Sequence, residues 1–252
     1  MHPDLDIARA GGLSYAYQPI VDIASRAIFA YEALLRGAQD EPAGVVLGPL
    51  SEASIEAIDA HARPRAIALA AKLGLNSRLH LNFQPRSLAS SSAVIDETLR
   101  VAARHGFSKE QIVLEVTETQ VIDDQRRFAD AVNEFRAEGV LVAIDDFGAG
   151  YSGLNLLANF QPDLVKLDME LVRGIAHHGP RQAIVRAIHQ VCNDLGIDVI
   201  AEGVESIDEY YWFEDQGVSL FQGYLFARPA FEALPAMNLP SARPTLKVLE
   251  RR

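Results

Sequence analysis

Short apolar runs alternate with helical patterns along most of the chain. Several of these runs are apolar at nearly every position, which is typical of β-strands that are buried on both faces. Eight runs are predicted as strands, namely residues 15–23, 27–35, 79–83, 112–117, 141–145, 164–168, 198–202 and 220–224.

Helical patterns fill most of the intervals between the predicted strands. The clearest helix covers residues 181–195 and stops at Gly196, because glycine readily ends a helix. Its apolar stripe at helical spacing consists of Ile184, Val185, Ile188, Val191, Cys192 and Leu195. Residues 124–138 and 51–73 are also predicted as helices, and Pro64 is expected to split or kink the second of them.

The order of these elements predicts the fold class. Only residues 24–26 join the first two strands, and a parallel crossover needs about a dozen residues, so this pair must be antiparallel. From residue 79 onward strands and helices alternate, which predicts a TIM-like (β/α)₈ barrel with one antiparallel strand. A doubly wound open sheet is the alternative, and it is disfavoured because no G-x-G-x-x-G follows the first strand.

Composition narrows the class of protein. The chain has 252 residues, of which 49% are hydrophobic and 23% are charged, as in ordinary globular proteins. We expect a single domain over residues 1–240 and a C-terminal tail over residues 241–252. Cys192 is the only cysteine, which excludes an intramolecular disulfide. No apolar run is long enough to span a bilayer and no signal peptide is recognisable, so we expect a cytoplasmic protein without membrane contact.

Acidic residues outnumber basic ones by 34 to 23, which gives a net charge of −11. This charge argues against binding of a polynucleotide through a basic surface. The acidic excess has two interpretations: it keeps the protein in solution, or a local group of carboxylates binds metal cations. The positions of the acidic residues decide between them.

Polar or charged residues lie at the ends of most predicted strands. In a barrel the carboxyl ends of the parallel strands converge on one rim, where this fold carries its chemistry. The alternative, that each strand end simply meets solvent, becomes weaker as more strands share the pattern. The residues concerned are Glu32, Asn82, Glu115, Asp145, Asp146, Lys166, Asp168 and Glu202.

Carboxylates gathered at one rim repel each other, and a single lysine compensates them too little, so protons or cations are expected there. Oxygen ligands with one amide favour Mg²⁺ or Mn²⁺.

His80 lies one layer deeper than Asn82 and is interpreted as a core or hydrogen-bonding histidine. The side chains of Asp145 and Asp146 are expected to diverge unless the strand ends between them. The glycine-rich residues 147–153 suit either a mobile lid or a plain connector.

Short motifs follow one another in a fixed order along the chain. They are Gln18-Pro19-Ile20, Glu32-Ala33-Leu34-Leu35-Arg36, Leu81-Asn82-Phe83, Glu115-Val116-Thr117-Glu118, Asp145-Asp146-Phe147-Gly148-Ala149-Gly150-Tyr151-Ser152, Val165-Lys166-Leu167-Asp168, Ala201-Glu202-Gly203-Val204-Glu205 and Gln222-Gly223-Tyr224-Leu225-Phe226-Ala227-Arg228-Pro229. The tripeptide Glu32-Ala33-Leu34 alone is a weak signal, whereas the whole set is specific and covers about residues 13–230. This ordered set resembles the EAL-domain family of cyclic di-GMP phosphodiesterases.

This resemblance implies a reaction and a set of site residues. The implied reaction is hydrolysis of cyclic di-GMP to linear pGpG by a water that two Mg²⁺ or Mn²⁺ ions activate. The implied ligands are Glu32, Asn82, Glu115 and Asp145 for the first ion, and Asp145, Asp146 and Glu202 for the second. Lys166 and Glu202 are the candidates that accept the proton of the water, and Glu118 is implied to hold the loop after Asp146. Substrate contacts are implied for Gln18, Arg36, Asp168, Glu205 and Gln222.

The chain departs from the family pattern at the edge of the implied substrate site. Gly37 stands where an aromatic residue is usual, Gln84-Pro85 follow Phe83, and the segment between Glu32 and Asn82 is short, but no implied metal ligand is lost. An alternative function is a catalytically inactive cyclic di-GMP receptor or protein-interaction module of the same fold. A third is an unrelated metal-dependent barrel enzyme of the enolising or aldol type. The resemblance also implies a homodimer.

Overall fold

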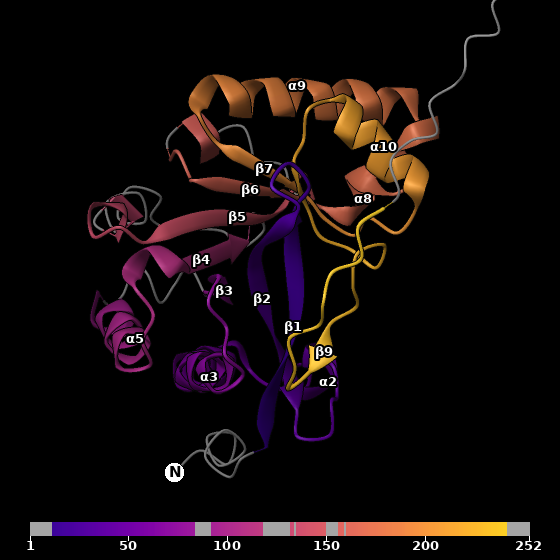
Figure 1. The fold of residues 1–252 in the computed structure, drawn as a ribbon. Helices are drawn as coiled ribbons and strands as arrows, with labels where there is room; N and C mark the ends of the chain where they lie inside the picture. The colour runs from indigo at the N-terminus through magenta and orange to yellow at the C-terminus, as the bar shows by residue number, and fades with distance from the viewer. Residues whose placement is uncertain are drawn as a thin grey trace, which may run out of the picture.

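The structure is a computed structural model that describes residues 12–83, 92–117, 132–133, 135–149, 156–158 and 160–240 (Figure 1). All eight predicted strands are present within a few residues of their expected bounds. They are β1 Leu13–Asp22, β2 Ala27–Gly37, β3 Arg78–Asn82, β4 Ile112–Thr117, β5 Leu141–Phe147, β6 Leu164–Leu167, β7 Asp198–Ala201 and β8 Leu220–Phe221. A ninth strand, β9 Ala230–Phe231, was not predicted, because two residues are too short to show a period.

The strands close into a barrel in the order β2-β3-β4-β5-β6-β7-β8-β1, and β1 also pairs with β2. Strand β1 is antiparallel to both β2 and β8, whereas the pairs from β2 to β8 are parallel. β9 adds to β1 at Ala16 and Tyr17. The TIM-like barrel with one antiparallel strand is therefore confirmed, and the open doubly wound sheet is wrong.

Helices pack around the outside of this barrel (Figure 1). They are α2 Ala43–Leu47, α3 Glu52–Lys72, α5 Ser92–Arg104, α8 Met169–Val172, α9 Gly179–Leu195 and α10 Ile207–Asp215, with 3₁₀ turns η1 Lys109–Gln111 and η2 Ile175–His177. Most of the predicted helix 124–138 lies outside the described residues. None of the described helices is both long enough and apolar enough to cross a bilayer.

Two predictions about helices need correction. Helix α3 continues through Pro64, so the expected split is wrong, while the alternative of a kink stays a prediction. Buried residues on both sides of the proline, including Ile58 and Ile67, pack into the same core and hold the helix together. Helix α9 ends at Gly196 as predicted, with φ of 72°, but only part of its predicted apolar stripe is buried. Ile184 is 51% exposed, while Val185, Ile188 and Cys192 face the barrel.

The interior of the barrel holds an apolar layer and a polar layer. The apolar layer consists of Ile20, Ala30, Val113, Ala143, Leu164, Ile200 and Leu220. Side chains two residues apart on a strand point to the same face, so the next inward position on each strand lies one layer nearer the carboxyl rim. Those positions are Gln18, Glu32, Asn82, Glu115, Asp145, Lys166, Glu202 and Gln222, while His80 lies one layer deeper, opposite Val113. Because β1 runs in the opposite direction, its polar residue precedes the apolar one.

Candidate metal centre and substrate cavity

Lys166 lies at the centre of the polar layer and is buried. Its Nζ atom is 2.8 Å from Glu115 Oε1, 2.9 Å from both Asp145 Oδ1 and Glu202 Oε1, and 3.3 Å from Glu32 Oε2. Burial by itself lowers the pKa of Lys166, but the attraction of the surrounding carboxylates outweighs burial and holds this pKa well above its usual value. Lys166 is therefore an ammonium that faces four carboxylates.

The carboxylates around Lys166 form two triads that share one residue. Oxygen atoms of Glu32, Glu115 and Asp145 all lie within 4.8 Å of one another, and so do oxygen atoms of Asp145, Asp146 and Glu202. A residue shared between two such triads is in the position of a bridging ligand in a two-cation site. The structure thus brings together five of the six residues that the sequence analysis assigned to metal binding.

The donor set fits hard divalent cations. Glu115 Oε2 is buried and has no hydrogen-bond partner in the described part of the chain, although an isolated buried carboxylate oxygen is costly. Burial, followed by the charges of neighbouring carboxylates, raises the pKa of Glu115 and of Glu202 well above the usual value. Mg²⁺ and Mn²⁺ prefer oxygen ligands. Such ions would neutralise the negative charge of the carboxylates that Lys166 alone does not compensate.

Asp146 joins the second triad through an irregularity in β5. The pairing of β5 with β6 shifts register between Ile144 and Phe147, and Asp146 has a left-handed φ of 52°. This bulge turns the Asp146 side chain toward the same rim as Asp145. The sequence analysis expected the two side chains to diverge unless the strand ended between them; instead the strand continues and the bulge brings them together. Burial and the charge of Asp145 raise the pKa of Asp146 to about 6.

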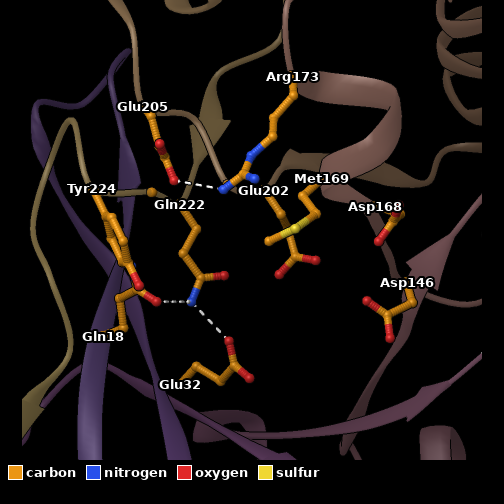
Figure 2. A pocket seen from close by; sticks show the side chains of 12 residues that line it. Gln18, Glu32, Asp146, Asp168, Met169, Arg173, Glu202, Glu205, Gln222 and Tyr224 are labelled. Carbon is orange, nitrogen blue, oxygen red and sulfur yellow. Dashed lines mark hydrogen bonds and ion pairs between the residues drawn. The ribbon is translucent and has the colours of Figure 1, made fainter.

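Two glutamines, Gln18 on the neighbouring strand β1 and Gln222 directly after β8, orient Glu32, Gln222 directly and Gln18 through Gln222. Gln222 Nε2 donates to Glu32 Oε2 at 2.7 Å and lies 3.4 Å from Gln18 Oε1 (Figure 2). Gln18 Nε2 in turn donates to the carbonyl oxygen of Ala227 at 3.0 Å. Asn82, the sixth predicted ligand, approaches the first triad by a long contact of 3.5 Å from its Nδ2 to Glu32 Oε1.

A cavity of about 190 Å³ opens above the second triad (Figure 2). Four of the five predicted substrate-binding residues line it, namely Gln18, Asp168, Glu205 and Gln222. Asp168 also caps α8, where its side chain accepts a hydrogen bond from the Glu170 amide at 2.8 Å. The cavity is acidic, which suits a phosphodiester substrate only if cations lie between the two sets of negative charge.

Sequence reasoning missed three side chains that line this cavity: Met169, Arg173 and Tyr224. Arg173 Nη2 pairs with Glu205 Oε1 at 2.8 Å across the rim (Figure 2). Tyr224 follows Gly223, whose φ is 157° and where a Cβ atom would overlap the backbone of Val204. The close approach of two loops therefore places Tyr224. A single aromatic or basic residue in a loop carries no periodic signal that could have identified it.

Arg36 does not reach the acidic cavity. It lines a second cavity of about 250 Å³ between β2 and α3, together with Asn82 and mostly apolar residues. Its guanidinium donates to the carbonyl oxygen of Leu35 at 2.8 Å and lies 3.4 Å from Asp40. Glu118, the implied tether of the loop after Asp146, lies outside the described residues, as does most of that loop.

His80 lies beneath the first triad and is completely buried. Its Nδ1 atom is 2.7 Å from Glu115 Oε1, which confirms the interpretation of a hydrogen-bonding core histidine. Burial, and next the charge of Lys166, lower the pKa of His80 to about 3, so the ring is neutral.

Comparison with known proteins places this geometry in one family. The EAL domain family model matches residues 4–229. The chain is 36% identical over 230 residues to the blue light- and temperature-regulated antirepressor BluF of Escherichia coli, covering 91% of this chain and 57% of BluF. It is 37% identical over 156 residues to the cyclic di-GMP phosphodiesterase PdeR of the same organism, covering 62% of this chain and 23% of PdeR. The chain therefore spans less than two thirds of these relatives.

Two solved structures share the fold. One is a standalone versatile EAL protein from Vibrio cholerae O395 in its c-di-GMP-bound form, with a TM-score of 0.85, 44% identity and coverage of 90% of this chain and 95% of that chain. The other is BlrP1 of Klebsiella pneumoniae in a manganese and cy-diGMP complex at pH 9.0, with a TM-score of 0.83, 38% identity and coverage of 88% and 57% respectively. The match over nearly the whole chain and the shared barrel lead to one conclusion: this chain belongs to the EAL domain family.

Proposed function

We propose that this protein hydrolyses cyclic di-GMP to linear pGpG with two divalent cations, Mg²⁺ or Mn²⁺. The observation that carries this proposal is the pair of carboxylate triads that share Asp145. Membership of the EAL domain family supports the substrate, and so does the name of the relative PdeR, a cyclic di-GMP phosphodiesterase. The manganese and cy-diGMP complex of BlrP1 supports the choice of metal.

The residues of the polar layer would hold the two cations. Glu32, Asn82, Glu115 and Asp145 would bind the first, and Asp145, Asp146 and Glu202 would bind the second. When bound, such a pair of ions lowers the pKa of a coordinated water and stabilises charge on the attacking and leaving oxygens of a phosphodiester. Gln222 keeps Glu32 oriented through the hydrogen bond at 2.7 Å.

Glu202 is the proton acceptor that we favour over Lys166. In the metal-free protein four carboxylates hold Lys166 as an ammonium, which has no lone pair to accept a proton. Glu202 lies 2.9 Å from the Lys166 ammonium and borders the acidic cavity, and its carboxylate oxygens carry lone pairs that can accept a proton. Lys166 then balances the negative charge of the ligands.

Substrate contacts are assigned to both cavities. Gln18, Asp168, Glu205 and Gln222 would contact the dinucleotide in the acidic cavity, and Arg36 would contact it from the second cavity, which Asn82 joins to the metal ligands. An arginine at that position suits a phosphate oxygen. Glu118 is proposed to hold the loop after Asp146, as the family resemblance implies.

A turnover assay tests this function. Purified protein is incubated with cyclic di-GMP and Mg²⁺ or Mn²⁺, with and without EDTA, and pGpG is measured by chromatography. We expect product only with metal, and none from the Asp145→Asn variant. The relative BluF is an antirepressor by name, so a receptor without turnover is the second candidate. Binding of cyclic di-GMP without formation of pGpG would establish the receptor. Absence of both binding and product would reject cyclic di-GMP as the substrate.

We also propose a homodimer in the cytoplasm. The family resemblance implies the dimer, and the exposed apolar side chains of Ile184, Val191 and Leu195 along α9 support a protein contact on this side of the barrel. Light scattering of the purified chain measures its mass in solution. A monomer at the concentrations used for the turnover assay would contradict the dimer.

A further inference from the structure

His80 makes a buried hydrogen bond to a proposed metal ligand. Its Nδ1 atom is 2.7 Å from Glu115 Oε1, and neither side chain is exposed to solvent. A carboxylate that binds a cation is ionised and can only accept hydrogen bonds. When a cation is bound, the hydrogen in this bond must therefore be on Nδ1 of His80, which fixes the tautomer of the ring.

The strands hold this pair in place. In the β3–β4 register, His80 is opposite Val113 and Asn82 is opposite Glu115, so the imidazole reaches one layer up to its partner. The ring of Phe29 contacts the imidazole edge-on, with centroids 6.4 Å apart. His80 is thus a rigid donor, anchored by backbone pairing and by packing.

The hydrogen bond occupies one oxygen of Glu115 and leaves the other available. Oε1 contacts both His80 Nδ1 and the Lys166 ammonium, while Oε2 is buried without a partner among the described residues. A carboxylate held by one oxygen cannot rotate freely, so the orientation of Glu115 within its triad with Glu32 and Asp145 is fixed, and Oε2 is the oxygen that no described residue occupies.

We propose that His80 is a positioning residue that presents Glu115 Oε2 to the first cation, and this inference rests on the proposed metal centre. Partners of this kind, which orient a metal ligand without touching the metal, contribute substantially to metal affinity. His80 itself contacts neither metal nor substrate.

Lys166 cannot replace His80 in this role. Its ammonium is shared among four carboxylates, and it carries the same sign of charge as a divalent cation, so the two compete for the same oxygens. The N–H of a neutral imidazole serves Glu115 alone and does not repel a cation.

Two variants of similar shape separate hydrogen bonding from packing. Histidine carries two atoms on Cγ, Nδ1 and Cδ2, and leucine and asparagine also carry two atoms there. Only asparagine offers an N–H at the position of Nδ1. We expect His80→Leu to weaken Mn²⁺ binding by about 10–100-fold, measured by calorimetry on the full chain with metal alone. His80→Asn should recover most of that loss. Equal affinity of the two variants, whether weakened or unchanged, would overturn the inference.

A measurement on the parent protein covers the case in which a variant does not fold. In ¹⁵N-histidine-labelled protein, NMR identifies the ring nitrogen of His80 that carries the proton. We expect an Nδ1–H signal that shifts when Mg²⁺ is added; an Nε2–H tautomer, or an Nδ1–H signal unmoved at saturating Mg²⁺, overturns the inference. If the parent binds Mn²⁺ but loses nothing in His80→Leu, only the role of His80 fails. If the parent binds no Mn²⁺, the proposed metal centre itself fails.

Discussion

Lys166 Nζ lies 2.9 Å from Asp145 Oδ1, the carboxylate that both triads share. One ammonium therefore contacts the residue on which both proposed cations depend. Lys166 neutralises part of the charge of these carboxylates, and divalent ions would compete with it for the same oxygens. The predictions below follow from this competition between a fixed ammonium and exchangeable cations.

Asp145→Asn keeps the shape of the side chain and removes the shared charge. Loss of a partner that only orients a ligand lowers metal affinity or activity by about 10–100-fold, so loss of a ligand to both ions should lower pGpG formation by more than about 100-fold. Chromatographic turnover assays at saturating Mn²⁺ measure the effect. Asp194→Asn on the exposed side of α9 is the matched control. Activity of Asp145→Asn within a few-fold of the control would contradict the shared-ligand assignment.

Lys166→Met removes the only cation that the four carboxylates contact in the described structure. Breaking a buried ion pair from one side costs about 3–5 kcal/mol, so the free energy of unfolding in EDTA should fall by about that amount. Saturating Mg²⁺ should restore part of the lost free energy of unfolding, because bound cations neutralise the same carboxylates. Urea unfolding with and without metal measures both effects, with Lys72→Met as the exposed control. If Lys166→Met lowers the free energy of unfolding equally with and without metal, Lys166 and Mg²⁺ do not compete for the same carboxylates.

The stability of the metal-free protein should depend on pH through the acidic cluster. Burial and Asp145 raise the pKa of Asp146 from 3.8 to about 6, and the pKa values of Glu115 and Glu202 are raised as well. A carboxyl group with a higher pKa in the folded state favours folding below its unfolded pKa, and this contribution is lost as the pH rises through the folded pKa. In EDTA, the free energy of unfolding should therefore fall as the pH rises from about 4 through about 6.

The stabilisation of the folded protein by divalent cations should increase with pH, opposite to the trend in EDTA. They bind ionised carboxylates, so the stabilisation by Mn²⁺ should grow over the interval in which Asp146 loses its proton. Thermal unfolding in EDTA and in Mn²⁺ across this pH range gives the melting temperature as a function of pH under each condition. A Mn²⁺-induced shift in melting temperature that stays constant with pH would show that these carboxyl groups do not bind the metal.

Two substitutions of Asp146 separate its backbone conformation from its charge. Asp146 has φ of 52°, a left-handed conformation that asparagine tolerates better than alanine. In EDTA, Asp146→Ala should be less stable than Asp146→Asn by about 1 kcal/mol, while both should lose Mn²⁺ affinity. Urea unfolding and calorimetry measure the two properties. Equal stability of the variants would mean that the bulge relaxes when the carboxylate is lost.

Local pattern was sufficient to predict most of the barrel and the polar residues that gather at one rim. Strand alternation is a property of neighbouring residues, so the step from Val113 to Glu115, or from Leu164 to Lys166, placed each polar side chain on the same face as its apolar neighbour. The short connection between β1 and β2 indicated the antiparallel pair for a similarly local reason. Motif order then indicated the family.

Other features depended on contacts between segments that are distant in sequence. The bulge at Asp146 arises from the pairing of β5 with β6, and Tyr224 and Arg173 reach the acidic cavity only because the loops after β6 and β8 fold over the same rim. Arg36 was predicted beside the same substrate residues, but the end of β2 directs it into the second cavity with Asn82.

The sequence by itself determined which side chains of a strand share one face, because alternation along a strand needs no knowledge of the neighbouring strand. Only the tertiary structure decided which of those residues meet. Closure of the sheet sets the distances between strands, and through them the sharing of Asp145 between two triads, the contact of His80 with Glu115, and the central place of Lys166.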